Sequence, residues 1–407
     1  MSGTLRTFVI PSKRNPKALM VTNIPVLNLV DQYKEVQSVL EQNVLNVLRS
    51  GHYILGEYGT RLENEVAAIC DAKYGIGVAN GTDALVLAMM ALDISAGDEV
   101  ITTPFTFAAT VEAILLRGGK PVFVDIDPVT FNIDVTKIEA AITPKTKVLL
   151  PVHLYGMPCN MPAIMEIAKK HNLRVVEDNA QGIGATVAGK PTGSYGDLAC
   201  ISFYPTKNLG AAGDAGMVVA NDEALAKRVK TIRAHGSVER YYHDELGVNS
   251  RLDEIQAAVL MSKVSFLKKW NDRRNQIATL YNECLKDCPN VQTPYIPTAE
   301  SGVTHVWHQY TIRVTHGRQH LIDSLKKRGI GSMCYYPVPL HTQKAFDLGY
   351  KLGDFPLAEK AAAEVLSLPM YPELTDSQAM TVARAVQEVM LEVTTVSPVA
   401  TPVVTNK

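Results

Sequence analysis

Lys207 is the residue in this chain whose type and surroundings best suit covalent chemistry. An apolar run at residues 198–203 precedes it, and glycines follow at positions 210, 213 and 216. A glycine-rich turn lets the backbone approach a ligand closely. A lysine amine held at a strand end can form a Schiff base with a carbonyl compound, including pyridoxal 5'-phosphate (PLP). The alternative is an exposed lysine in a glycine-rich loop, the usual environment of this residue.

Asp178 and Gln181 could supply what a PLP-bearing lysine needs. Residues 174–177 have the pattern of a buried strand, and Asp178 stands at its carboxyl end. PLP acts as an electron sink only while its pyridine nitrogen stays protonated, and a carboxylate partner holds that proton. Gln181, three residues further on, could donate a hydrogen bond to the ring hydroxyl of the cofactor. The alternative is that Asp178 caps a following helix, which is common for aspartate after a strand.

Gly81 and Thr82 form a candidate phosphate site. They stand between a short apolar stretch and a helical pattern that starts at Ala84. The free amide groups and the dipole at a helix N-terminus bind phosphate. The same sequence is also an ordinary helix cap. The three features in this order nevertheless make a much stronger signal together than each does alone.

The elements that must position these residues are short strands alternating with helices. Strand patterns occur at residues 99–102, 121–124, 148–153, 174–177, 199–203 and 217–220, with helical patterns at 108–116 and 161–171 between them. This alternation predicts an α/β fold with a mostly parallel sheet covered by helices. Ligands of such sheets gather at the carboxyl ends of the strands. The segments of Phe107, Asp178 and Lys207 can therefore converge on one site.

The rest of the chain predicts a second, smaller α+β domain. A long helical stretch at residues 251–288 leads to a strand pattern at 308–314 and helical patterns at 319–328 and 377–392. We therefore expect an N-terminal segment at 1–23, a large domain at 24–255, a smaller domain at 256–393 and a mobile tail at 394–407.

Composition excludes several classes of function. A formal net charge of −1 argues against nucleic acid or an anionic membrane as the main partner. The six cysteines show neither a CxxC pair nor metal-ligand spacing, so we expect no metal and reduced thiols in the cytoplasm. There is no signal-peptide pattern and no apolar stretch long enough to span a bilayer.

The ordered motifs resemble those of the DegT/StrS-type nucleotide-sugar aminotransferases, a group of fold-type I PLP enzymes, over residues 24–393. The blocks that carry the resemblance are 80–85 (NGTDAL), 103–110 (TPFTFAAT), 177–181 (EDNAQ), 202–210 (SFYPTKNLG), 247–258 (GVNSRLDEIQAA) and 335–341 (YYPVPLH). Asn179 departs from the pattern, because the family more often carries a small residue there. This change could alter packing beside the cofactor.

The resemblance implies a role for each matching residue toward PLP. Lys207 would carry the cofactor and then move a proton between the cofactor and the carbon that bears the amino group. Asp178 would pair with the pyridinium, and Gln181 with the ring oxygen. Phe107 would stack on the pyridine ring, although without the resemblance it would be assigned as an ordinary core aromatic. The phosphate would be held by Gly81, Thr82 and Ser202.

Other matching positions concern the substrate and the neighbouring subunit. In relatives, the asparagine that matches Asn249 reaches the cofactor phosphate of the neighbouring subunit, which implies a homodimer with shared active sites. The alternative is a loop asparagine that caps the next helix. Tyr204, Tyr336 and His341 match positions on the substrate side, although tyrosines near the lysine could also serve packing. We assign His308 to a structural role, like the histidines at positions 153 and 305.

The function implied by the resemblance is transfer of an amino group from L-glutamate to a nucleotide-linked keto-sugar, in amino-sugar and polysaccharide (for example O-antigen) biosynthesis. The nucleotide would be UDP or dTDP, and the matches lean toward a ketone at C3, with C4 as the alternative. A non-catalytic regulator on the same fold is another possibility, but it would have little reason to keep Lys207, Asp178 and Gln181 together. A PLP-dependent dehydratase would carry histidine in place of the lysine.

Overall fold

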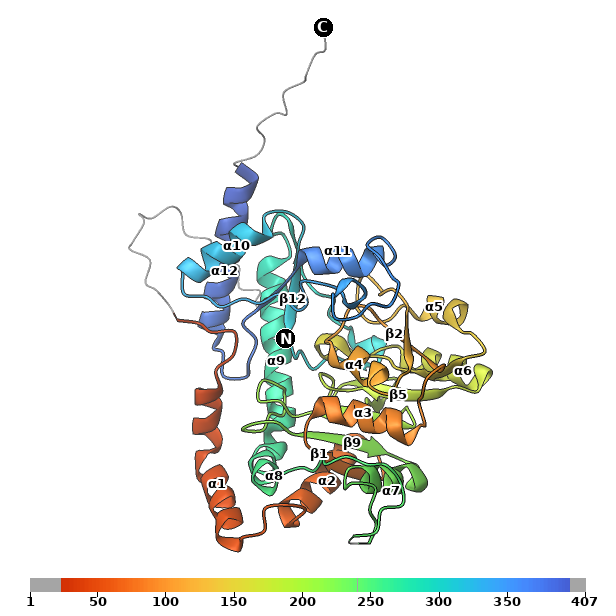
Figure 1. Ribbon diagram of the computed structural model, residues 1–407. Helices are drawn as coiled ribbons and strands as arrows, with labels where there is room; N and C mark the ends of the chain where they lie inside the picture. The colour runs from red at the N-terminus through yellow and green to blue at the C-terminus, as the bar shows by residue number, and fades with distance from the viewer. Residues whose placement is uncertain (1–22, 240, 396–407) are drawn as a thin grey trace.

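The central sheet positions the candidate site. The structure, a computed structural model, describes residues 23–239 and 241–395 (Figure 1). Seven strands form this sheet in the order β1-β9-β8-β5-β4-β2-β3. Their bounds are Tyr74–Val78 (β1), Glu99–Thr102 (β2), Lys120–Phe123 (β3), Thr146–Leu149 (β4), Arg174–Asp178 (β5), Leu198–Ser202 (β8) and Gly216–Ala220 (β9).

The sheet is mostly parallel, as predicted. The neighbours from β3 to β8 all pair in parallel, whereas β9 is antiparallel to both β8 and β1. The direction of β9 follows from the path of the loop at residues 203–215 that precedes it. The amide of Phe203 donates to the carbonyl of Ala215, so the chain leaves β8, turns and returns directly beside it. A strand that returns beside its predecessor in this way pairs with it in the antiparallel direction.

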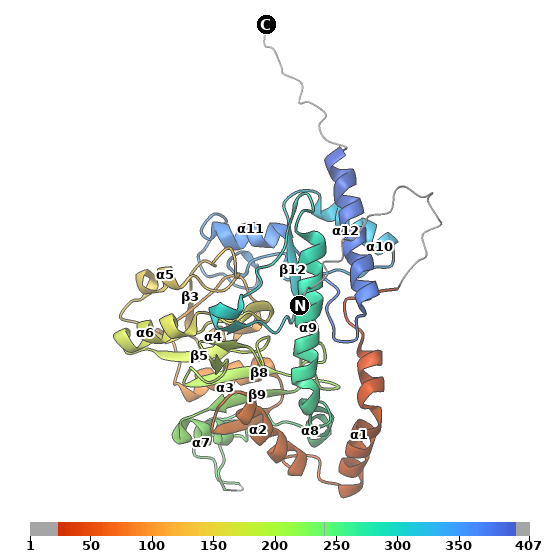
Figure 2. The ribbon, with the colours of Figure 1, turned by 180° about the vertical axis from the view of Figure 1, so that it is seen from behind.

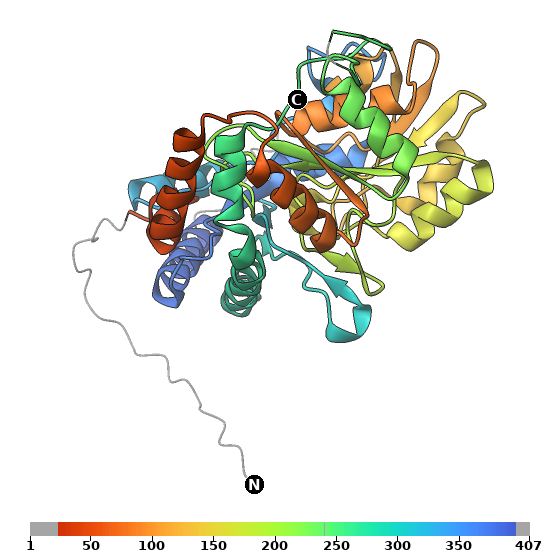
Figure 3. The same cartoon turned by 90° about the horizontal axis from the view of Figure 1, so that it is seen from below.

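Helices cover both faces of the sheet (Figure 3). Side chains alternate between the faces of a strand, and Cys200 packs against one helical layer while Ile201 packs against the other. The first layer consists of α3 (Gly81–Ala91), α4 (Ala109–Leu115) and α7 (Glu223–Ile232). The opposite face is covered by α2 (Glu57–Ile69), α8 (Glu254–Met261) and, beside β4 and β5, α6 (Met161–His171). The predicted α/β architecture with two helical layers is confirmed.

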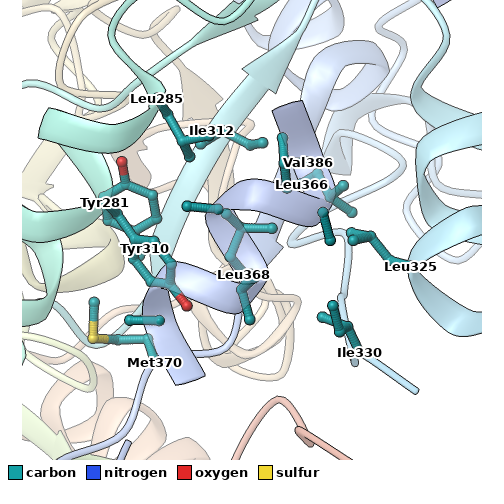
Figure 4. Packing of buried hydrophobic residues seen from close by; sticks show 14 of the residues in the cluster. Tyr281, Leu285, Tyr310, Ile312, Leu325, Ile330, Leu366, Leu368, Met370 and Val386 are labelled. Atoms are coloured by element: carbon teal, nitrogen blue, oxygen red, sulfur yellow. The ribbon is translucent and has the colours of Figure 1, made fainter. Parts of the chain in front are cut away.

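A second core lies beside the first, around an antiparallel sheet of order β10-β12-β13. Its strands are Val291–Gln292 (β10), Tyr310–Val314 (β12) and Val365–Leu368 (β13), and its helices are α9 (Leu267–Leu285), α10 (Arg318–Lys327) and α12 (Asp376–Thr395). Figure 4 shows Tyr281 of α9 and Tyr310 of β12 packed together in this core. Ile24 packs here as well and bridges to Ile330, far from it in the sequence.

α9 joins the two cores. Its first residue, Leu267, packs in the core of the large sheet, whereas Ile277 and Leu285 pack in the second core. α12 lies alongside α9, and α1 (Leu29–Ser50) lies alongside α8, which Figures 1 and 2 show from opposite sides. The domain boundary predicted between residues 255 and 256 stays a prediction.

Two predicted segments differ in detail from the structure. The helical stretch expected at residues 251–288 is divided into α8 and α9 by a 3₁₀ turn at Val264–Phe266. The first two residues of the tail expected from residue 394 belong to α12, which continues to Thr395. The remainder of that tail, and residues 1–22 of the expected N-terminal segment, lie outside the described residues.

The remaining elements are peripheral to the site. They are α5 (Val135–Ile138), α11 (Pro356–Glu364) and a small sheet formed by β6 (Thr186–Val187), β7 (Lys190–Pro191) and β11 (Val303–Thr304). In the part of the chain that the structure describes, no helix has the length and apolar character needed to cross a membrane.

Candidate active site

The predicted site residues converge at the carboxyl edge of the large sheet. β5 ends at Asp178 and its parallel neighbour β8 ends at Ser202, with Asp178 in register with Cys200. A cavity of about 720 Å³ opens at this edge, where ligands of parallel sheets usually bind. Nine of the residues predicted from the sequence line it: Gly81, Thr82, Phe107, Asp178, Gln181, Ser202, Tyr204, Lys207 and Tyr336.

A tight turn presents Lys207 to the cavity. The amide of Lys207 donates to the carbonyl of Tyr204 over 2.8 Å. The turn requires glycine at position 210, because a Cβ atom there would lie 2.3 Å from the carbonyl oxygen of Pro205. Burial lowers the pKa of Lys207 to about 8, against the opposing influence of the Asp178 carboxylate. At pH 7 about a tenth of this amine is therefore unprotonated and able to act as nucleophile or base.

Asp178 is held rigidly in a buried position, with 5% of its surface exposed. The hydroxyl of Thr110 donates to Oδ2 over 2.8 Å, and the amide of Ala180 donates to Oδ1 over 3.2 Å. Burial raises the pKa of Asp178, while these two hydrogen bonds and then the charge of Lys207 oppose the rise. The residues that follow form turns and not a helix. The alternative role of Asp178 as a helix cap is therefore wrong.

The amide of Gln181 is oriented by its neighbours. Its Oε1 accepts a hydrogen bond from the backbone amide of Tyr155 over 2.7 Å. Its Nε2 donates to the hydroxyl of Tyr336 over 3.3 Å. The NH₂ group is therefore the part of the side chain on the cavity side. This orientation is the one required for donating to an oxygen of a ligand.

The N-terminus of α3 lies against Ser202 at one end of the cavity. Asn80 is the N-cap residue, and its side chain accepts from the amide of Asp83. A Cβ atom at Gly81 would lie 2.5 Å from the Cβ of Ser202, and one at Gly216 would lie 2.4 Å from the carbonyl oxygen of Asn80. Only glycine permits this close approach at both positions. Amide groups of a helix N-terminus beside a serine hydroxyl suit a phosphate group.

Phe107 and Tyr336 form an aromatic wall. Their ring centroids lie 6.1 Å apart, with the planes tilted by 39°. Phe107 keeps 54% of its surface exposed, although it lies among buried residues of the same segment. The alternative assignment of Phe107 as an ordinary core aromatic is therefore wrong. An exposed aromatic face in a cavity is a suitable platform for a planar ligand.

Asn249 lies in a neighbouring hollow and does not line the main cavity. This hollow, of about 450 Å³, shares Asn80 and Asp214 with the main cavity. The next helix, α8, begins at Glu254 with Asp253 as its N-cap residue. The alternative role of Asn249 as the cap of that helix is therefore wrong, and its side chain is exposed.

His341 is the predicted site residue that lies away from both hollows. It is buried, and its Nε2 lies 2.9 Å from a carboxylate oxygen of Glu359. Its ring packs edge-on against Phe355, with the ring centroids 4.9 Å apart. These contacts hold the imidazole in the protein interior, so His341 does not contact a ligand in the main cavity of this chain.

His308 was predicted to have only a structural role, but it is a cavity residue. It is buried and also lines the cavity, next to Gln309. The signal in the sequence was its position at the start of the strand predicted at 308–314, beside an amide side chain. Other lining residues that were not predicted are Asn80, Asp83, Thr106, Asp214 and Tyr335. By contrast, His153 is fully buried against Glu177, with 3.0 Å between Nε2 and Oε2, as expected of a structural histidine.

Comparison with known proteins gives a consistent result. The chain matches the model of the DegT/DnrJ/EryC1/StrS aminotransferase family over residues 35–387. A "Pleiotropic regulatory protein" of Geobacillus stearothermophilus is 50% identical over 367 residues, which cover 90% of this chain and 98% of that protein. A UDP-N-acetyl-3-dehydro-alpha-D-glucosamine 3-aminotransferase of Acidithiobacillus ferrooxidans is 45% identical over 369 residues, covering 91% and 98%. The crystal structure of DesV of S. venezuelae, in complex with a ketimine intermediate, is 40% identical, with a TM-score of 0.87 and coverage of 90% and 98%.

Proposed function

Because this chain belongs to the DegT/DnrJ/EryC1/StrS aminotransferase family, we propose that it moves an amino group from L-glutamate to a nucleotide-linked keto-sugar with the help of PLP. The observation that carries the proposal is the placement of Lys207 and Asp178 in one cavity, at the ends of neighbouring strands. A buried lysine with a lowered pKa in the same cavity as a buried carboxylate is typical of functional sites, and it suits this chemistry.

The residues present fit PLP. The N-terminus of α3 and the hydroxyl of Ser202 would hold the phosphate, and the lack of a Cβ atom at Gly81 lets these two groups lie close together. Phe107 would stack on the ring, and the NH₂ group of Gln181 would donate to the ring oxygen. When bound, PLP supplies the electron sink on which amino-group transfer depends.

Two side chains would move or hold protons. Lys207 would hold the cofactor covalently and afterwards, as a free amine, would move a proton between the carbon that bears the amino group and the cofactor, in one direction with the amino acid and in the other with the sugar. A pKa of about 8 suits this double role, because both forms of the amine are populated near neutral pH. Asp178 holds the proton on the ring nitrogen, and the hydrogen bonds from Thr110 and Ala180 fix its carboxylate for that purpose.

Relatives support a sugar substrate with the ketone at C3. The printed name of the Acidithiobacillus relative specifies a 3-dehydro sugar on UDP. Two other relatives, 41% and 44% identical, are named for 3-amino sugars on dTDP. We therefore propose a UDP- or dTDP-linked 3-keto-hexose as substrate and an amino sugar for polysaccharide assembly, such as O-antigen, as the destination. A 4-keto-sugar is the alternative.

A shared active site in a homodimer is part of the proposal. Asn249 is exposed in a hollow that adjoins the cavity, where it could reach the cofactor phosphate of a second chain. The loop before it exposes large apolar side chains at Val238, Tyr242 and Leu246. Exposed apolar groups beside an incomplete site favour contact with another subunit. Six free cysteines favour the cytoplasm as its location.

A regulatory function without catalysis is the second candidate, because the 50% identical relative is named as a regulatory protein. The convergence of Lys207, Asp178 and Gln181 argues against a silent site. A panel of UDP- and dTDP-linked 3-keto and 4-keto sugars, incubated with isotope-labelled glutamate, tests both candidates by mass spectrometry. We expect labelled nitrogen in a 3-amino sugar. If PLP is bound and no sugar accepts nitrogen, the regulatory function is favoured.

A further inference from the structure

His308 lies in the wall of the cavity, two residues before β12, and only 6% of its surface is exposed. A buried histidine in a ligand cavity can present a hydrogen-bond donor, a hydrogen-bond acceptor or a positive charge, and each of these favours a different ligand group. Which of them His308 presents depends on the protonation state and the tautomer of its ring. The surrounding hydrogen bonds decide that tautomer.

A chain of oriented amides ends at Nδ1 of His308. Nδ2 of Asn271 donates to the carbonyl of Ile183 over 3.2 Å, so Oδ1 of Asn271 is left to accept. Nδ2 of Asn208 donates to that oxygen and to the carbonyl of Val306, both over 2.8 Å. Because the NH₂ group of Asn208 is used in this way, its oxygen is the atom that faces the ring.

Oδ1 of Asn208 lies 3.2 Å from Nδ1 of His308. An amide oxygen can only accept, so Nδ1 must carry the hydrogen. In a neutral imidazole the other nitrogen, Nε2, then carries a lone pair and can only accept. Nε2 of Gln309, a donor, lies 3.5 Å from it, a long contact that agrees with this assignment and that a substrate hydroxyl would replace.

The electrostatic surroundings keep the ring neutral. Burial, followed by the positive charges of Lys207 and Arg274, holds the pKa of His308 well below its ordinary value. Arg274 comes from α9, and its guanidinium also donates to the carbonyl of Trp307 over 3.1 Å. Lys207 and Asn208 are neighbours in one turn, so the turn that presents the nucleophile also orients the histidine.

We propose that Nε2 of His308 is a fixed hydrogen-bond acceptor for a hydroxyl group of the sugar substrate, and that His308 thereby determines specificity in the sugar half-reaction. The inference rests on the proposed function. A sugar ring presents O–H donors, whereas the carboxylates of glutamate can only accept and are not served by a lone pair. Sites built to hydrogen-bond a substrate hydroxyl strongly reject analogues that lack it.

The decisive experiment measures the two half-reactions separately, the glutamate half-reaction in enzyme loaded with PLP and amination of the keto-sugar in enzyme loaded with pyridoxamine phosphate. His308→Phe keeps a ring of similar size but removes the acceptor, whereas His308→Gln keeps a donor for Asn208 and an acceptor for the cavity. We expect His308→Phe to slow amination of the UDP-linked keto-sugar at least ~100-fold and to change the glutamate half-reaction much less. His308→Gln should recover at least ~10-fold of the loss. Cofactor affinity and urea unfolding confirm that each variant is folded.

A second arm uses keto-sugars that lack one hydroxyl at a time. Wild-type enzyme should reject one of these deoxy sugars strongly, and His308→Phe should treat that sugar and its parent nearly alike. If His308→Phe lowers the rates of both half-reactions by the same factor, or lowers neither rate, His308 does not bind the sugar and the inference is wrong. The proposed function is unaffected by that outcome, because the wild type still aminates the sugar. If the wild type aminates no keto-sugar, the proposed function fails, and this role of His308 fails with it.

The tautomer can be tested without turnover. In protein with nitrogen-labelled histidine, long-range proton–nitrogen correlation spectra distinguish an Nδ1–H ring from an Nε2–H ring. The signal that disappears in His308→Gln belongs to His308. An Nδ1–H pattern that persists on both sides of neutral pH supports the inference, and an Nε2–H or imidazolium pattern overturns it.

Discussion

The hydroxyl of Thr110 donates a hydrogen bond to Oδ2 of Asp178 over 2.8 Å, and both side chains are buried. Thr106 lies behind Thr110, with 3.2 Å between the hydroxyl oxygens. Since the hydrogen of Thr110 is used on Asp178, Thr106 must donate to Thr110. This relay of hydroxyl groups favours the ionised carboxylate, because hydrogen bonds to a charged acceptor are stronger than those to a neutral one.

Thr110→Val should therefore impair catalysis without disturbing the fold. Valine has nearly the same shape but cannot donate, and loss of a hydrogen bond to a charged group costs about 1.5–3 kcal/mol. We expect kcat to fall roughly 10- to 100-fold. Thr110→Ser keeps the hydroxyl and should retain most of the rate. Equal rates for the two variants would show that the hydrogen bond has no catalytic role.

Asp178→Asn should keep the fold and most of the affinity for PLP but lose most of the turnover. A neutral amide cannot hold the proton on the ring nitrogen, so the electron sink is weakened. We expect kcat to fall at least ~100-fold, about 2.7 kcal/mol of transition-state stabilisation. Steady-state kinetics with saturating glutamate and keto-sugar give the value. Turnover close to that of the wild type would show that Asp178 has only a structural role.

Lys207 should be the residue that binds PLP covalently, at a rate that depends on pH. The nucleophile is the unprotonated amine, and the pKa of Lys207 is lowered to about 8. In the cofactor-free enzyme the attachment rate should therefore level off above about pH 8 and fall about tenfold per pH unit below it. Borohydride reduction and peptide mapping locate the attachment site. Lys207→Ala should bind the cofactor only non-covalently, and a label on any other lysine would show that the assignment is wrong.

Asn179→Ala should make the protein more stable. Asn179 is fully buried, and among the described residues neither atom of its amide has a hydrogen-bond partner. A buried unpaired polar group costs about 1–3 kcal/mol, and removing it also removes that cost. We expect a rise of about 1 kcal/mol in the free energy of unfolding, measured in urea, after the loss of packed atoms is included. Asn179→Asp is the matched control and should be destabilising.

Two inactive variants should restore activity when they share a dimer. In a heterodimer of Lys207→Ala and Asn249→Asp chains, one site receives both changes and the other receives an intact lysine and an intact asparagine. The pairing follows from two-fold symmetry, in which each chain lends the same residue to its partner. We expect activity in the mixture above the sum of the parents. If heterodimers form but remain inactive, Asn249 serves its own chain and the shared site is wrong.

The sequence was sufficient to predict the class of fold and the part of the site that depends on local structure. Lys207, Asp178 and Ser202 stand at or just beyond strand ends, and Gly81 opens a helix. In a parallel sheet the carboxyl ends of the strands meet at one edge, so position along the chain already places these residues together. Patterns of apolar residues and glycines are local signals, and they determined the class of fold and the placement of these residues at one edge of the sheet.

Only the tertiary structure decided the orientation of the side chains and the residues that they contact. His308 enters the cavity and His341 does not, because one ring meets Asn208 and the other meets Glu359, a partner from a separate helix. Phe107 remains exposed within an otherwise buried segment. These outcomes depend on contacts between residues far apart in the chain. Local periodicity does not encode such contacts, because they are set by how the two cores pack against each other.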